Sequence, residues 1–208
     1  MNKRLIAFGC SNTYGEGLED CWINGMYGPK PSKFAWPNVL GNLLGVDEVI
    51  NLAAPAISNK RIWRDALNFD YQDNDIVVLH WTFVDRDCFF DRVPKIGPWI
   101  NEKASKFYYK YFWSNLDRHY DLFNRADHVG RYLTSKKIKH YNIQTTGSSG
   151  GGRAAYRPEE IPKWFEVDFL PGNMNTKVID RALDKMHPGP LTHKKFANEV
   201  FNKVQHAV

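Results

Sequence analysis

The stretch that decides the fold is RLIAFGCSNTYG, residues 4–15. Its first five residues are mostly apolar and predict a β-strand, and the small residues after them predict a tight turn into a helix. The turn presents Ser11 between Gly9 and Gly15, and glycines let a substrate approach the backbone. Serine is also a favoured helix cap, so the stretch leaves both a chemical and a structural role for Ser11 open.

A second informative stretch is DKMHPG, residues 184–189. Serine is a poor nucleophile unless an imidazole takes its proton and a carboxylate orients that imidazole. Asp184 lies three residues before His187, so its carboxylate can reach the ring nitrogen that faces away from the serine. A lone histidine in a loop is otherwise usually structural. The rival acid and the rival histidine are Asp180 and His193, the latter inside a predicted helix.

Short β-type runs alternate with helical stretches along the sequence. Strands are predicted at residues 4–8, 48–52, 75–81 and 138–143. Helices are predicted at residues 34–44, 58–69, 116–133 and 190–204. The alternation predicts an α/β fold in one domain, residues 1–208, built as a three-layer α/β/α sandwich on a mostly parallel sheet. An aromatic-rich insertion at about 88–115, with a loop as its first half, and a flexible loop at 147–152 interrupt the pattern.

Three segments follow predicted strands and should meet at one edge of the sheet, because functional loops gather at the carboxyl ends of parallel strands. They are the turn at Ser11, residues 53–59 and residues 82–86. Acyl transfer needs hydrogen-bond donors for the oxyanion, and residues 53–59 offer small residues and the Asn59 amide. The alternative is an ordinary loop with a helix cap at Ser58.

The last of these segments, together with the residue before it, also offers candidate substrate contacts. They are Trp81, Thr82 and Arg86. The alternative for Arg86 is a purely structural ion pair with its neighbour Asp85.

Composition excludes several classes of protein. The chain has 208 residues and a formal net charge of +5, with a basic cluster at 136–140 that is either a solvated surface or a flank attracting acidic polymers. No apolar run of about 18 residues exists, so no membrane partner is expected. No nucleic-acid-binding motif accompanies the basic residues, so no nucleic acid is expected either. The apolar start is too short for a signal peptide, which predicts a cytoplasmic location, with virion association left open.

The cysteines argue against a metal site or a disulfide framework. Cys10, Cys21 and Cys88 have no metal-ligand spacing, and an odd number suits a reducing compartment. Cys10 adjoins Ser11 and is the alternative nucleophile. We expect no metal and no cofactor.

The two stretches together resemble the SGNH (GDSL-like) hydrolases, a family of esterases and acetylesterases with a flavodoxin-like α/β/α fold. The family block around Gly-Asp-Ser at the end of strand one is similar to Gly9-Cys10-Ser11, and its last block, Asp-x-x-His, is similar to residues 184–187. The resemblance spans nearly the whole chain and implies a mostly parallel five-stranded sheet. It points to SGNH-like proteins of bacteriophages and bacteria, whose substrates are rarely assigned.

The sequence departs from the family blocks in three places. Cys10 replaces the usual aspartate, Ala56 stands at the glycine of the second block, and the Gly-x-Asn-Asp of the third block is absent. The resemblance implies an oxyanion hole made by the backbone N–H groups of Ser11 and Ala56. Asn59 is the candidate for the missing amide donor, and Thr82 is the second choice.

The resemblance implies a serine esterase in which Ser11 attacks the ester, His187 is the base and Asp184 orients His187. The expected partner is a small-molecule or glycan ester, with an acetyl or other short acyl group on a sugar or polysaccharide. The alternative, motivated by the missing third block, is an inactive SGNH-fold protein that serves as a phage structural or carbohydrate-binding component. A homo-oligomer or a place in a virion stays open.

Overall fold

A parallel five-stranded sheet forms the centre of the protein. The computed structural model describes residues 2–89, 93–145, 165, 167–170 and 174–205. The sheet strands, in spatial order, are β4 (Glu48–Asn51), β1 (Arg4–Phe8), β5 (Ile76–Trp81), β8 (Lys139–Gln144) and β9 (Phe169–Leu170). All four neighbouring pairs are parallel. Of these five strands, β4 is the second along the chain, and it lies outside β1, the first. This is the flavodoxin-like order, and the predicted fold class is confirmed.

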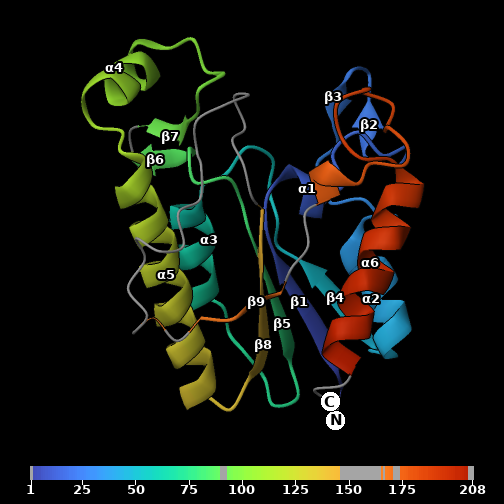
Figure 1. The fold of residues 1–208 in the computed structure, drawn as a ribbon. Helices are drawn as coiled ribbons and strands as arrows, with labels where there is room; N and C mark the ends of the chain where they lie inside the picture. Colours follow the sequence, from blue (N-terminus) through green and yellow to red (C-terminus); the bar gives the residue numbers. More distant parts are fainter. Residues whose placement is uncertain (1, 90–92, 146–164, 166, 171–173, 206–208) are drawn as a thin grey trace.

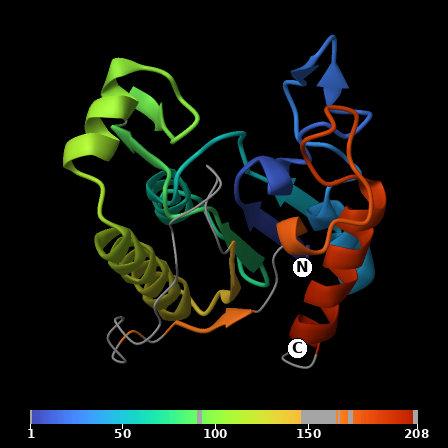
Figure 2. The same cartoon turned by 45° about the horizontal axis from the view of Figure 1, so that its top comes forward.

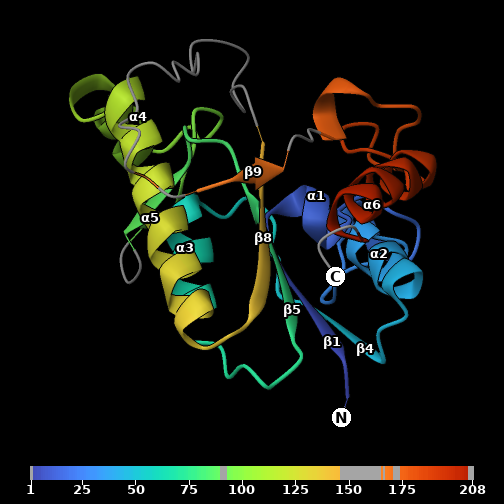
Figure 3. The same ribbon diagram turned by 60° about the horizontal axis from the view of Figure 1, so that its bottom comes forward.

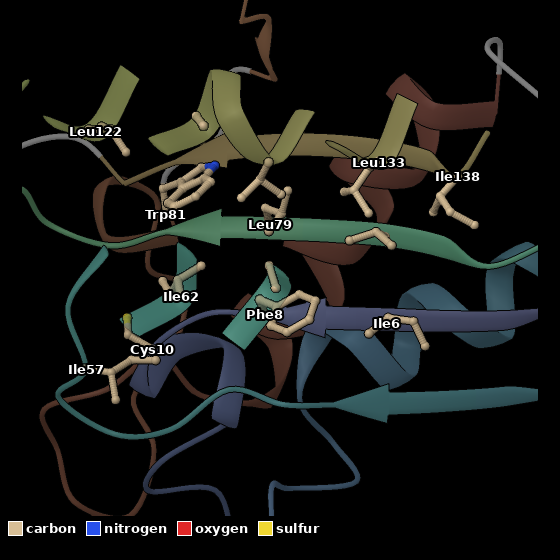
Figure 4. Close-up of a cluster of buried hydrophobic side chains, with 14 of the residues drawn as sticks. Ile6, Phe8, Cys10, Ile57, Ile62, Leu79, Trp81, Leu122, Leu133 and Ile138 are labelled. Carbon is tan, nitrogen blue, oxygen red and sulfur yellow. The ribbon is translucent and has the colours of Figure 1, made fainter. Parts of the chain in front are cut away.

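Helices cover both faces of this sheet and complete three layers (Figures 1 and 3). One face carries α3 (Asn59–Leu67) and α5 (Asn115–Ser135), and the other carries α2 (Trp36–Leu44) and α6 (Pro190–Val204). Each face of the sheet has its own apolar cluster, and Figure 4 shows the one beneath α3 and α5. Side chains of β5 alternate between the two clusters, which explains why that strand is apolar almost throughout.

The helix ends follow from local chemistry. Ser58 caps α3, because its hydroxyl accepts the backbone N–H of Arg61. Gly45 ends α2 in the left-handed conformation at a φ of 62°. The predicted boundaries of the four main helices differ from the observed ones by no more than two residues at either end.

Short elements extend the edge of the sheet where the strands end (Figures 1 and 2). They are a hairpin of β2 (Trp22–Ile23) and β3 (Met26–Tyr27), a second ribbon of β6 (Asp87–Phe89) and β7 (Val93–Ile96), α4 (Lys103–Tyr111) and the 3-10 turn η2 (Met174–Thr176). The expectation of a loop in the first half of the insertion is wrong, because β6 and β7 pair there. Strands this short leave almost no alternation to detect.

Two further expectations concern the loop at 147–152 and membrane-spanning helices. The predicted flexible loop at 147–152 lies outside them. Among the helices that the structure does describe, none is long and apolar enough to cross a membrane.

Candidate active site

The turn after β1 holds Ser11 at the first position of a short helix, α1 (Ser11–Tyr14). Cys10 is the N-cap residue, so Ser11 is not the helix cap that the sequence left open. Gly9 is required by packing: a Cβ there would lie 2.2 Å from the Thr13 hydroxyl oxygen. Glycine therefore lets the chain fold back sharply, and Ser11 comes to lie directly at the carboxyl end of the central strand.

A buried histidine anchors this turn to the sheet. The Thr13 hydroxyl lies 2.8 Å from Nδ1 of His80, and the Thr145 hydroxyl lies 3.0 Å from its Nε2. The ring stacks on Phe196, with the ring centres 5.5 Å apart. Burial lowers the pKa of His80 to about 4, so the imidazole is neutral at physiological pH. His80 thus has a structural role, which the sequence analysis did not assign.

Asp184 and His187 form a tight pair in the loop before α6. The carboxylate Oδ2 lies 2.5 Å from His187 Nδ1, and Oδ1 accepts the backbone N–H groups of Met186 and His187 at 2.9 and 3.0 Å. Lys185 adopts a φ of 59°, which closes the turn between them. Burial opposes ionisation of Asp184, but the hydrogen bonds from His187 and Met186 outweigh it and lower the pKa of the carboxyl. The carboxylate is therefore charged and fixes the imidazole.

The fold brings the two ends of the sequence together at this point. The backbone N–H of Leu183 donates to the carbonyl of Gly17 at 2.9 Å. Gly17 has a φ of 85°, and a Cβ there would lie 2.6 Å from the carboxyl carbon of Asp184. The loop that carries Asp184 and His187 thus packs directly on the segment after α1, and Figure 1 shows these segments side by side.

Glu16 is a site residue that the sequence analysis missed. Its Oε2 lies 3.7 Å from His187 Nε2, and its backbone N–H donates to the Ser11 carbonyl at 3.0 Å. Burial raises the pKa of the Glu16 carboxyl above its usual range. The only signal in the sequence was an acidic residue directly after the glycine that ends α1.

Ser11 itself is 6% exposed. Within the described residues its hydroxyl has no hydrogen bond to His187, whose Nε2 faces Glu16 instead. Hydrogen bonds between catalytic groups are often long before substrate binds, so the lack of a hydrogen bond between Ser11 and His187 does not decide whether Ser11 is the nucleophile. The role of Ser11 stays a prediction.

The loop after β4 lies against the turn of Ser11, because the Ala54 N–H donates to the Gly9 carbonyl at 3.2 Å. Ala56 adopts a φ of 59°, the left-handed conformation in which glycine is at ease. No described residue accepts a hydrogen bond from the backbone N–H of Ser11 or of Ala56. Two backbone donors are thus free at the edge where the predicted oxyanion hole would lie.

The Asn59 amide is engaged elsewhere. Its Nδ2 donates to the Thr82 carbonyl at 3.0 Å, and its Oδ1 accepts the Thr82 N–H at 2.7 Å. This pairing fastens α3 to the end of β5. A second amide, Asn51, which the sequence analysis did not single out as a donor, donates to the Thr13 carbonyl at 2.7 Å.

The three candidate substrate contacts lie in different surroundings. Trp81 and Thr82 are fully buried, and Trp81 packs in the core with its Nε1–H donated to Asn142 at 2.8 Å. They are core residues rather than surface contacts. Arg86 is partly exposed, and its guanidinium contacts the rings of Phe83 and Trp99. It forms no ion pair with Asp85 in the described part of the chain.

The rival acid and histidine hold the start of α6. His193 is fully buried and accepts the Trp36 N–H at its Nδ1 over 3.0 Å, and burial lowers its pKa to about 3. Asp180 accepts the backbone N–H groups of Leu191 and Thr192 at 3.0 and 2.9 Å. Burial opposes its ionisation, but these bonds and one from the Thr192 hydroxyl lower the pKa of Asp180.

Several solved structures that are similar to this chain are described as a lipolytic protein or as esterases. A protein described as lipolytic and of the G-D-S-L family, from Desulfitobacterium hafniense, is 13% identical, covers 97% of this chain and 99% of its own, and has a TM-score of 0.56. A carbohydrate acetylesterase from Sinorhizobium meliloti is 11% identical over 100% of both chains, with a TM-score of 0.56. The chain has the SGNH-hydrolase fold.

A third similar structure is a carbohydrate esterase family 2 enzyme with a carbohydrate-binding domain, from Corynascus thermopiles (Myceliophthora fergusii). It is 13% identical, covers 100% of this chain and 67% of its own, and has a TM-score of 0.62. No protein-family model and no curated protein matches the sequence. At such low identity the likeness establishes the SGNH fold, and the chemistry has to be argued from this chain's own residues. The resemblance to phage proteins stays a prediction.

Proposed function

We propose that the protein is a serine esterase that removes acetyl or other short acyl groups from a sugar or polysaccharide. The observation that carries the proposal is the Asp184–His187 pair, packed against the segment that begins with Ser11. A charged carboxylate that fixes the Nδ1 side of an imidazole leaves Nε2 for proton transfer. The turn that presents Ser11 and the loop that presents His187 meet at the carboxyl edge of the sheet, where ligands bind in open α/β folds.

In the proposed reaction, Ser11 Oγ attacks the ester carbonyl while His187 Nε2 takes its proton. The resulting tetrahedral intermediate collapses, the C–O bond to the alcohol breaks, and His187 returns the proton to the leaving oxygen. Water then attacks the acyl-serine with His187 again as base, which releases the acid and restores Ser11. Asp184 stays ionised throughout and stabilises the imidazolium.

The free backbone N–H groups of Ser11 and Ala56 are the proposed oxyanion donors. Fixed N–H dipoles stabilise charge that develops on the carbonyl oxygen without any reorganisation at the moment of reaction. Asn59 would join them only through the second hydrogen of its Nδ2, because the first is donated to Thr82.

Two observations favour a sugar ester as the substrate. Two of the structures compared above are a carbohydrate acetylesterase and a carbohydrate esterase. Exposed aromatic rings, which stack well on sugars, lie on and near α4. They are Trp99, Phe107, Tyr111 and Phe112.

A fluorophosphonate probe tests the nucleophile directly. Labelling of the wild type, lost in Ser11→Ala and kept in Cys10→Ala, is the expected result and separates the serine from the neighbouring thiol. A screen of acetylated sugars and short acyl esters, with Ser11→Ala as the blank, then identifies the ester. Absence of both labelling and turnover would overturn the proposal.

The engaged Asn59 amide favours a second candidate, an inactive SGNH-fold protein that binds carbohydrate. It predicts sugar binding by calorimetry in wild type and Ser11→Ala alike, with no labelling of either protein.

A further inference from the structure

Arg86 follows β5 and forms no ion pair within the described residues. Its guanidinium carbon is 5.0 Å from the centre of the Phe83 ring and 4.8 Å from the centre of the Trp99 ring, so the group contacts two aromatic rings. Its Nε and Nη1 atoms are buried and have no hydrogen-bond acceptor. Buried polar groups nearly always have partners, and an unpaired one is costly, so this arrangement calls for an explanation.

The position of Arg86 relates it to the ester-cleaving residues. It follows β5, the strand beside β1, and therefore lies at the same edge of the sheet as Ser11. Its positive charge acts on Glu16, together with that of Lys95, and Glu16 contacts His187. Arg86 thus acts electrostatically on a residue that contacts the proposed base.

Other partly buried arginines of the described residues are neutralised. Arg4 pairs with Asp75 at 2.7 Å, and Arg118 pairs with Asp87 at 2.7 Å. Arg86 differs in having no carboxylate partner among the described residues. An arginine without a carboxylate partner is suited to a ligand anion, because a guanidinium binds carboxylate or phosphate oxygens with fixed geometry.

We propose that Arg86 binds an anionic group of the substrate, so that the ester cleaved at Ser11 belongs to a sugar bearing a carboxylate or a phosphate. This inference rests on the proposed esterase function and narrows its substrate class. Trp99 is 45% exposed and its ring contacts the guanidinium, so the sugar ring would lie against its indole while the anion reaches Arg86. The net charge of +5 favours the approach of such a substrate.

Three acetylated methyl glycosides of matched shape test the proposal: a glucoside, a glucuronide and a glucoside 6-phosphate. We expect wild-type kcat/KM for at least one anionic ester to exceed that for the neutral ester by about tenfold or more. Arg86→Gln should abolish this preference through KM, so that the variant cleaves the anionic and the neutral esters with similar kcat/KM. Arg86→Lys should restore part of it, because lysine keeps the charge but not the planar fork.

Arg61→Gln is the matched control, since it removes the same charge from an exposed arginine on α3 that pairs with Asp65. It should keep the preference. The comparison of the glucuronide with the glucoside 6-phosphate shows whether the site prefers a carboxylate or a phosphate. Equal kcat/KM for all three esters in the wild type, or a preference that survives Arg86→Gln, would overturn the proposal while the esterase function stands.

Binding keeps the two proposals separable if no ester is cleaved. Calorimetry measures binding of the deacetylated glucuronide and of the deacetylated glucoside 6-phosphate to the wild type and to Arg86→Gln. The difference between the two proteins reports on Arg86 alone. Binding that depends on Arg86 supports the anion site, and no Arg86-dependent binding rejects it. Thermal unfolding of each variant shows whether it is folded.

Discussion

His187 Nε2 lies 3.7 Å from Glu16 Oε2, across the ring from the Nδ1 atom that is bound to Asp184. The imidazole is therefore flanked by two carboxylates. Burial raises the pKa of Glu16, the positive charge of His187 opposes the rise, and the negative charge of Asp184 adds to it. Glu16 is thus a partly buried acid held next to the proposed base, at some expense to stability.

We expect Glu16→Gln to be more stable than the wild type at about pH 8, but not at about pH 4. The folded state holds the Glu16 proton to a higher pH than the unfolded chain does, so ionisation of Glu16 weakens folding as pH rises through that range. Glutamine cannot ionise. Thermal unfolding at both pH values measures the difference, at roughly 2–4 °C of Tm per kcal/mol for a chain of this size.

Glu19→Gln is the control for this effect, because Glu19 is exposed and lies three residues away. The stability of Glu19→Gln relative to the wild type should be the same at both pH values. A wild type that is more stable than Glu16→Gln at the higher pH would contradict the interpretation and indicate that Glu16 supports the fold.

The sequence predicted most of the framework because its signals are local and strong. Periodic apolar positions marked α2, α3, α5 and α6, and an apolar run marked β5. It did not locate β9, which has two residues, or the β6–β7 ribbon, because such short strands are defined by their partners rather than by their own pattern.

The candidate site was predictable only where a spacing carried chemistry. Asp184 and His187 are three residues apart, so their pairing could be read from the sequence. The Glu16–His187 contact joins residues far apart in the chain, and the engagement of Asn59 depends on how α3 meets the end of β5. Those relationships exist only after the sheet has formed.

Asp184→Asn and Asp180→Asn should distinguish a catalytic role of Asp184 from a purely structural role of Asp180. Both acids accept backbone N–H groups and both have a lowered pKa, but only Asp184 contacts His187. We expect Asp184→Asn to lower kcat by about 10²–10⁴-fold, as the imidazole loses its orienting carboxylate. Asp180→Asn should cost about 1–2 kcal/mol of stability and leave kcat within a few-fold.

Esterase kinetics and urea unfolding of both variants measure this contrast. Since a lowered carboxyl pKa stabilises the fold above the unfolded pKa, both variants should also lose less stability than the wild type as pH falls through the acid range. A similar loss of kcat in the two variants would remove the distinction between Asp184 and Asp180.

Ala56 is predicted to tolerate glycine but not valine. A φ of 59° destabilises the folded state by about 1 kcal/mol when the residue is alanine, and glycine avoids this strain. Glycine also raises the conformational entropy of the unfolded chain, which lowers stability by a similar amount. Ala56→Gly should therefore leave stability within about 0.5 kcal/mol and keep activity. Ala56→Val should lose about 1–3 kcal/mol, because a β-branched residue is strained at positive φ. Urea unfolding measures both, and a stable, active Ala56→Val would show that the loop conformation does not matter.

The contact between Gly17 and Asp184 gives the sharpest test of how the two ends of the chain build one site. Gly17 and Gly25 have similar φ angles, 85° and 79°. A Cβ at Gly17 would lie 2.6 Å from the Asp184 carboxyl carbon, whereas a Cβ at Gly25 would meet nothing within 4 Å.

Gly25→Ala therefore carries only the cost of a left-handed alanine, about 1–2 kcal/mol, and should leave kcat/KM unchanged. Gly17→Ala carries the same backbone cost and also pushes Asp184 away from His187, so it should lose about 1–3 kcal/mol more and at least about tenfold in kcat/KM. Unfolding and kinetics on the same two preparations separate the effects, because strain common to both variants cancels in their difference. If Gly17→Ala and Gly25→Ala had equal kcat/KM, the position of Asp184 could not be what sets the reactivity of the site. The proposed catalytic triad of Ser11, His187 and Asp184 would then have to be abandoned.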